Sequence, residues 1–370
     1  MALKILLGGI PLGCDNIGDE AILAGVVRML RESGREMEIT VATADPATGP
    51  RLGVATVPLW GESEIGRTDV FIWCGATGLS DYPDRALDLL ALARRHGKTA
   101  FVWGVGMDDE LNPVYFKAHG RKRLALKCAG LGTGLFVRTY EKLLERRLAR
   151  RLKFELSHCR GIWLRDEESR RRLLSLAPGL DVGVTADSAL DFGLSHRAAP
   201  AFPAALGLCI STQRQVRDLE GVKGLIAAVR AAGHPVIGLA MNPKTDRALM
   251  TSLGVECIAG DTPEAITAAA AGCGLILSSR LHLLILAANV RTPVRGIARG
   301  SKLANFLANF SLSVDGSVDS CDWPQLAKKV IADLKDTGLA ERFGAARDAA
   351  YAKLAARFAA AKKELFGRLP

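Results

Sequence analysis

Short apolar runs that end in glycine-containing loops constrain the fold of this chain more than any other feature. Runs of this form occupy residues 3–7, 69–74 and 99–103. Such runs are typical of buried strands in a parallel sheet, and ligands bind beyond the carboxyl ends of those strands. Because glycine lets the backbone approach a ligand closely, Gly75, which follows the second run, is a candidate ligand-binding residue.

A second series of strands and helices occupies the other half of the chain. Residues 195–205, with Pro200 and Pro203 among alanines, are typical of a linker. Apolar runs follow at 206–210, 235–239, 275–277 and 293–297. The alternation predicts an α/β protein with two doubly wound, Rossmann-like domains that face each other across a cleft. We expect one domain at 1–197, a second at 206–320 and C-terminal helices at 321–370.

Composition excludes several classes of protein. The chain has 370 residues, of which 49% are hydrophobic and 24% charged, as in a globular protein. Its longest apolar runs are well short of a membrane span, and its N-terminus lacks the features of a secretion signal. The eight cysteines show no metal-ligand spacing. We therefore predict a cytoplasmic protein that needs no metal and no cofactor.

The net charge of +10 predicts an anionic partner. Nucleic acid is the least favoured, because no zinc-finger, RRM or KH signature is present and only 6% of residues are aromatic. Basic residues concentrate at 121–160, where leucines at 143, 144, 148 and 152 give an apolar stripe. A solvated helix face is the favoured interpretation, and peripheral contact with the inner face of the membrane is the alternative.

The stretch Ser278-Ser279-Arg280-Leu281-His282 combines an anion site with an acid or base. It follows an apolar run and precedes a helical pattern, and its serines offer an N-cap. Free N–H groups of such a helix bind anions. Arg280 adds a fork that can hold a carboxylate or phosphate, and His282 adds a proton donor near neutral pH. The alternative is a surface Arg and a structural His; because both lie between apolar runs, we favour function.

Five motifs, in order along the chain, resemble those of the polysaccharide pyruvyl transferase family. They are Asn16-Ile17-Gly18-Asp19-Glu20-Ala21-Ile22-Leu23, Arg165-Asp166-Glu167-Glu168-Ser169, Thr185-Ala186-Asp187, Ser279-Arg280-Leu281-His282, and Gly296-Ile297 with Lys302. Each motif is moderately specific alone, and the five together cover most of the chain.

The resemblance implies a GT-B-like fold and a transferase. The enzyme would move pyruvate from phosphoenolpyruvate to two hydroxyls of a sugar, forming a cyclic ketal on a cell-surface polysaccharide or its lipid-linked precursor. The family's Arg and His carry over to Arg280, as donor ligand, and His282, as acid. We interpret Asp19 as the base and Lys302 as a phosphate ligand. The motifs make five further residues candidates for substrate binding: Asn16, Gly18, Ser279, Arg165 and Asp187.

Two departures and two alternatives stay open. The first loop, GGIPLGCDN, differs from the family's aromatic version, and the Arg expected soon after the strand at 206–210 is shifted to Arg214 or replaced. A nucleotide-sugar glycosyltransferase is one alternative, although such enzymes carry a Glu-rich segment and residues 273–297 contain no Glu or Asp. A non-catalytic protein that binds sugars or anions is the other.

Overall fold

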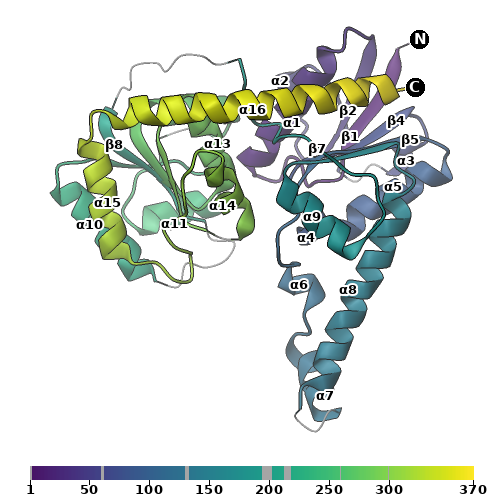
Figure 1. Ribbon diagram of the computed structural model, residues 1–370, viewed down its shortest axis with the longest axis horizontal. Helices are drawn as coiled ribbons and strands as arrows, with labels where there is room; N and C mark the ends of the chain where they lie inside the picture. Colours follow the sequence, from purple (N-terminus) through teal and green to yellow (C-terminus); the bar gives the residue numbers. More distant parts are fainter. Residues whose placement is uncertain are drawn as a thin grey trace. The chain divides into compact units, whose positions relative to one another are not determined.

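The computed structural model describes residues 2–59, 62–129, 133–193, 202–211, 218–258, 260–298 and 300–370. The chain divides into two compact units, each with its own parallel sheet (Figure 1). The first unit comprises Met1–Pro11, Arg31–Thr185 and Ala360–Pro370, and the second comprises Leu12–Leu30 and Ala186–Ala359. Both units are discontinuous in the sequence, whereas the predicted domains were contiguous ranges. Arg214 and the first part of the predicted linker lie outside the described residues.

A seven-stranded parallel sheet forms the core of the first unit, in the order β3-β2-β1-β4-β5-β6-β7. Its strands are β1 (Leu3–Gly8), β2 (Met37–Thr43), β3 (Ala55–Pro58), β4 (Val70–Cys74), β5 (Thr99–Val105), β6 (Gly161–Leu164) and β7 (Gly183–Val184). The strand order reverses between β1 and β4, which is where doubly wound sheets bind ligands. The three strands predicted from the glycine-terminated runs, β1, β4 and β5, are confirmed.

Helices connect the strands of the first unit. They are α2 (Thr48–Leu52), α3 (Glu62–Ile65), α4 (Gly78–Asp81), α5 (Pro83–Arg95), α6 (Pro113–Phe116), α7 (Gly120–Ala129), α8 (Leu135–Leu156) and α9 (Glu167–Leu176). The end of α16 (Leu339–Arg368) also belongs here. On that end, Glu364 accepts a hydrogen bond from the Trp163 indole at 3.1 Å, and the Arg368 guanidinium lies 5.4 Å from the Trp163 ring.

The second unit has a four-stranded parallel sheet in the order β11-β10-β8-β9. Its strands are β8 (Phe202–Cys209), β9 (Val236–Gly238), β10 (Cys273–Ser278) and β11 (Val294–Gly296). Its helices are α1 (Ile17–Arg31, all but the last residue), α10 (Leu219–Ala231), α11 (Thr245–Ser252), α12 (Pro263–Gly272), α13 (Leu281–Asn289), α14 (Ser301–Ala308), α15 (Trp323–Lys335) and most of α16. Because β8 begins at Phe202, the predicted linker is wrong for residues 202–205.

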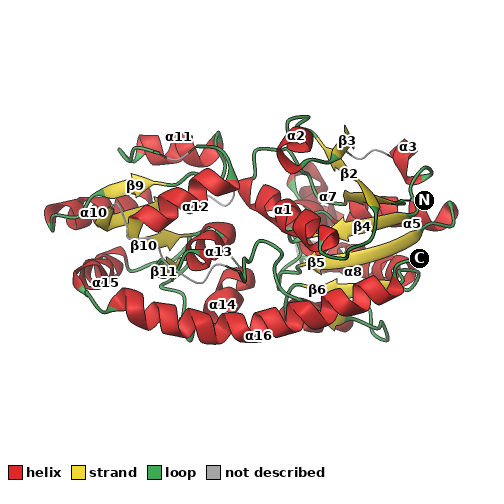
Figure 2. Cartoon of the chain, turned by 90° about the horizontal axis from the view of Figure 1, so that it is seen from above, coloured by secondary structure: helices red, strands yellow, loops and turns green. Residues whose placement is uncertain are grey.

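Helices cover both sides of this second sheet. Leu206, Leu208, Leu275 and Leu277 point into a core that α10 and α15 close. The helices α13 and α14 lie on the other side of the sheet, where Leu303 and Leu307 pack close to Gly296 of β11 (Figures 1 and 2). The unit is therefore a doubly wound α/β sandwich, as predicted from the alternation of apolar runs.

Candidate functional site

The turn between β10 and α13 carries Ser279, Arg280 and His282. Its serines shape the turn and do not cap the helix, so the N-cap prediction is wrong: Arg280 occupies the N-cap position without a side-chain cap. The Ser278 hydroxyl accepts the Arg280 N–H at 2.8 Å, and the Ser279 hydroxyl accepts the Ser211 N–H at 2.9 Å. Both serines are buried. They hold the start of α13 against the carboxyl end of β8, where the first N–H groups of α13 have no intrahelical partner.

Arg280 grips a buried carboxylate of its own unit. Its Nε donates to Asp246 Oδ2 at 3.0 Å and its Nη2 donates to Oδ1 at 2.8 Å. Asp246, from the first turn of α11, is completely buried and also accepts the Asn242 N–H at 2.9 Å. The pair is a bidentate fork that orients the guanidinium. Among the described residues, Nη1 of Arg280 has no hydrogen-bond partner.

Asp246 is a residue that the sequence interpretation missed. An acidic residue in the first turn of a helix is normally explained by the helix dipole, and nothing in its spacing points to Arg280. The Cys209 thiol at the end of β8 lies 3.7 Å from the same carboxylate. Burial and the negative charge of Asp246 raise the pKa of this thiol, so Cys209 is a packed, protonated neighbour of the ion pair.

His282 stacks against the first turn of α1. A Cβ added at Gly18 would lie 2.3 Å from Nδ1 and 2.6 Å from Cγ of the imidazole, so only glycine fits beneath the ring. On the other side, Nε2 lies 3.5 Å from Asp187 Oδ2. The other oxygen of Asp187 accepts the Ala189 N–H at 3.0 Å, which fixes the carboxylate. Gly18 and Asp187 thus confine the imidazole from two sides.

Asp19 is the second titratable group at this place. Only 3% of it is exposed, and its Oδ2 accepts a hydrogen bond from Asn16 Nδ2 at 2.7 Å. Burial raises the pKa of Asp19 to about 6, although the positive charges of His282 and Lys302 and the bond from Asn16 act to lower it. Both His282 and Lys302 therefore lie within electrostatic reach of this carboxylate.

The loop before α1 is fixed by other segments of the same unit. Asn16 Oδ1 accepts the Gly18 N–H at 3.2 Å, and the Ile17 N–H donates to the Met241 carbonyl at 3.0 Å. Asp15 forms a 2.6 Å ion pair with Lys244. These contacts place the start of α1, from the N-terminal end of the sequence, beside the start of α13 from the C-terminal half.

Eight of the ten predicted site residues consequently lie in the second unit: Asn16, Gly18, Asp19, Asp187, Ser279, Arg280, His282 and Lys302. Gly75 and Arg165 belong to the first unit. Gly75, with φ of 77°, follows β4 and donates its N–H to the Trp103 carbonyl at 2.9 Å. Arg165 follows β6, is 7% exposed, and packs where a Cβ of Gly106 would lie 2.5 Å from its Nη2. The carboxyl ends of β4, β5 and β6 thus form a separate cluster.

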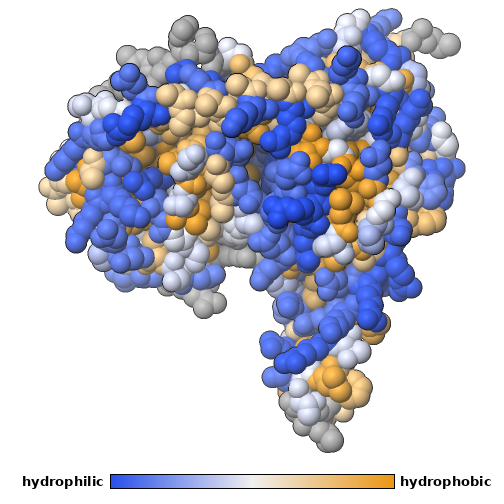
Figure 3. Space-filling view, in the orientation of Figure 1, coloured by the Kyte–Doolittle hydropathy of each residue, from blue (hydrophilic) through white to orange (hydrophobic). Residues whose placement is uncertain are grey.

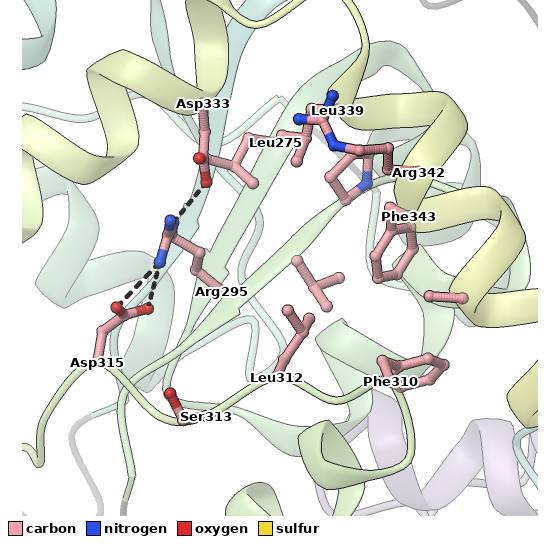
Figure 4. A pocket seen from close by; sticks show the side chains of 13 residues that line it. Leu275, Arg295, Phe310, Leu312, Ser313, Asp315, Asp333, Leu339, Arg342 and Phe343 are labelled. Atoms are coloured by element: carbon pink, nitrogen blue, oxygen red, sulfur yellow. Dashed lines mark hydrogen bonds and ion pairs between the residues drawn. The ribbon is translucent and has the colours of Figure 1, made fainter.

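The predicted site residues do not line the pocket found in the second unit. Within the described ranges, no group of three or more His, Cys, Asp or Glu side chains could hold a metal. A pocket of about 230 Å³ lies at the amino end of β10 and β11, lined by Leu275, Phe310 and Phe343 (Figure 4). At its rim Arg295 pairs with Asp315 at 2.9 Å and with Asp333. The predicted residues lie at the opposite, carboxyl end of β10.

Comparisons with known proteins agree with the motifs and the fold. A family model described as polysaccharide pyruvyl transferase matches residues 16–301. The glycotransferase of kitacinnamycin is 12% identical with a TM-score of 0.58, and the match covers 100% of both chains. A putative UDP-N-acetylglucosamine 2-epimerase from Listeria monocytogenes is 11% identical, with a TM-score of 0.58 over 96% of this chain and 95% of that one.

A third solved structure gives the same result. UGT71G1 of Medicago truncatula, solved with UDP-glucose, is 11% identical with a TM-score of 0.55 over 100% of this chain and 98% of that one. No curated protein matches the chain significantly. At these identities the solved structures establish the fold alone, which is GT-B-like, as predicted. The family model covers most of the sequence, and the chain therefore belongs to the polysaccharide pyruvyl transferase family, a family of transferases.

Proposed function

We propose that the protein transfers pyruvate from phosphoenolpyruvate to two hydroxyls of a sugar as a cyclic ketal. The proposal rests chiefly on one observation: the start of α1 and the start of α13 bring a buried carboxylate of raised pKa, Asp19, next to His282. Two titratable groups in one polar, buried site are suited to acid and base roles. Family membership supplies the reaction class.

Each group then has one task. The Asp19 carboxylate takes the proton of an acceptor hydroxyl, whose oxygen bonds to the enol carbon of the donor. His282 gives a proton to the methylene carbon, which becomes a methyl group. When the second hydroxyl bonds to the same carbon, the carbon–oxygen bond to phosphate breaks, and phosphate leaves with the second proton. Atoms and charges balance without a metal, a reductant or an oxidant.

The neighbours position these two groups and the donor. Asp187 Oδ2 lies 3.5 Å from the buried Nε2 of His282 and would stabilise the charged imidazole, so we assign the proton exchange to Nδ1. The donor carries a carboxylate and a phosphate. We propose that one of these two anionic groups binds to Nη1 of Arg280 and to the N–H groups at the start of α13. The other anionic group would then bind to Lys302. Gly75 and Arg165, in the first unit, are proposed to bind substrate as well, and this unit is proposed to take the saccharide acceptor.

Product analysis tests the reaction. The protein is incubated with phosphoenolpyruvate and a panel of free and lipid-linked saccharides, and the products are examined by mass spectrometry for a pyruvate ketal and by assay for released phosphate. Phosphate release together with a ketal supports the proposal. Transfer of a sugar from UDP-glucose or another nucleotide sugar, without reaction of phosphoenolpyruvate, would establish the glycosyltransferase alternative instead.

A matched pair of histidine variants tests the acid. We expect His282→Gln to lower the turnover number by about 10²–10⁴-fold, with an unchanged melting temperature. His234 is the control, because it is a buried histidine of the same unit, outside the predicted site, and its Nδ1 contacts the Ala204 carbonyl at 3.0 Å. His234→Gln should lower the melting temperature and leave turnover of the folded protein normal. Normal turnover in His282→Gln would remove His282 from the mechanism.

A further inference from the structure

A helical hairpin projects from the first unit (Figure 1), and its tip carries exposed basic and apolar side chains. We define the hairpin tip as the described residues between 113 and 143, which include α6, α7 and the start of α8. Helix α7 has no buried residue along its entire length. A helix of ten residues is not stable alone in water, and α7 contributes no fully buried side chain that would explain why it is kept.

The charge on the hairpin tip is predominantly positive. Residues 113–143 contain seven Lys and Arg side chains and one Glu. Arg121, Arg123 and Lys127 are exposed on α7. The other half of α8 differs: Leu152 and Leu156 are completely buried, and Arg151 pairs with Asp84 at 2.8 Å. Within the basic segment 121–160, Arg151 is therefore engaged in ion pairs with α5, and the unbalanced charge lies further out.

Large apolar side chains lie among these charges. Leu124 is 64% exposed, Leu135 is 62% exposed and Phe136 is 48% exposed. The surface of the projection is hydrophilic along its length, with hydrophobic side chains near its end (Figure 3). Exposed apolar groups between basic residues are the composition of segments that lie in the headgroup layer of an anionic bilayer. A nucleic-acid surface would instead gain little from exposed leucines.

We propose that the hairpin tip docks the protein on the surface of an anionic lipid bilayer. The charge complementarity and the apolar groups fix the occupant as lipid, and no spanning segment is involved: no helix in the described parts of the chain is long and apolar enough to cross a membrane. Docking does not depend on the proposed reaction, since all its residues lie on α6 to α8. It would give the enzyme access to an acceptor held in the membrane.

Vesicle sedimentation tests the docking. Wild-type protein should pellet with vesicles of phosphatidylcholine and phosphatidylglycerol, and much less with phosphatidylcholine alone. The triple variant Arg121→Gln, Arg123→Gln, Lys127→Gln should partition on the order of 100-fold more weakly, from about 1 kcal/mol for each charge. Gln preserves helix propensity, and Lys122 is left unchanged because it lies over the Tyr140 ring and ties α7 to α8.

The control removes the same charge elsewhere. Lys328→Gln, Lys335→Gln and Lys353→Gln neutralise three exposed lysines of the second unit and should leave pelleting as in wild type. Leu135→Ser with Phe136→Ser should weaken binding about tenfold even in high salt. The proposal is overturned if wild type fails to pellet with anionic vesicles, if the two charge triples behave alike, or if the protein binds polyphosphate but no vesicle.

Discussion

Replacing Asp19 with Asn should make the protein more stable and less active at once. The carboxylate is 3% exposed, and burial raises its pKa from 3.8 to about 6. At about 1.36 kcal/mol for each pKa unit, ionising this group in the folded state costs about 3 kcal/mol relative to the unfolded chain. Asn removes the charge and can still accept the hydrogen bond from Asn16.

The sign of the effect follows from the raised pKa. Below about pH 4 the carboxyl is protonated in both states, and its contribution to stability is fully present. As pH rises from about 4 through 6, wild type loses stability and Asp19→Asn does not. The variant should therefore gain up to about 3 kcal/mol over wild type between these values, with a constant difference above pH 6. Urea unfolding at pH 4, 5, 6 and 8 measures this difference.

The activity of Asp19→Asn should fall, although its stability rises. If Asp19 is the base, turnover of wild type rises through about pH 6, and Asp19→Asn loses about 10²–10⁴-fold. Asp181, an exposed carboxylate, gives the matched control Asp181→Asn, which should change stability by less than about 0.5 kcal/mol. An Asp19→Asn variant that is less stable than wild type at pH 8, by an amount that does not vary with pH, would refute the reasoning.

Two further predictions concern the residues around this pair. Gly18→Ala would put a methyl group 2.3 Å from Nδ1 of His282, and should cost about 1–3 kcal/mol of stability, measured by thermal unfolding, and most of the activity. The control is Gly224→Ala, at a helix position with nothing within 4 Å, which should stabilise the protein by about 0.5–1 kcal/mol in the same assay. Asp246→Asn should cost about 3–5 kcal/mol because it leaves the Arg280 guanidinium buried with its partner neutralised; an unchanged unfolding midpoint would contradict this.

The sequence predicted the local elements of the site better than their contacts. Strand β10 and helix α13 follow from the run at 275–277 and the apolar pattern after it, and α9 begins as its motif indicates, with Asp166 accepting the Ser169 N–H at 2.7 Å. These features depend on neighbours along the chain. The N-cap prediction failed because the buried serine hydroxyls are used across the turn and between strands.

Long-range partners could not be read from spacing. Nothing along the chain pairs Asp246 with Arg280, or places Gly18 under the ring of His282. Each pairing depends on how loops after different strands meet when the sheet forms. The family motifs marked Gly18 and His282 as separate candidates, and geometry gives the reason that a side chain at position 18 is excluded. Asp246 lies in none of the five motifs, so only the folded chain identifies it.

The ion pair changes how the donor's charge must be balanced. Arg280 alone would offer a full positive charge to the proposed donor, phosphoenolpyruvate, but the Asp246 carboxylate, 2.8 Å away, neutralises it. Attraction must then come from the N–H groups at the start of α13 and from Lys302, whose charge also acts on Asp19. A donor anion bound near Lys302 would offset the electrostatic stabilisation that Lys302 gives to the ionised Asp19 carboxylate. The pKa of Asp19 would therefore rise further. Donor binding should therefore take up protons between about pH 6 and 8, an uptake that calorimetry in buffers of different ionisation enthalpy detects and that Asp19→Asn removes.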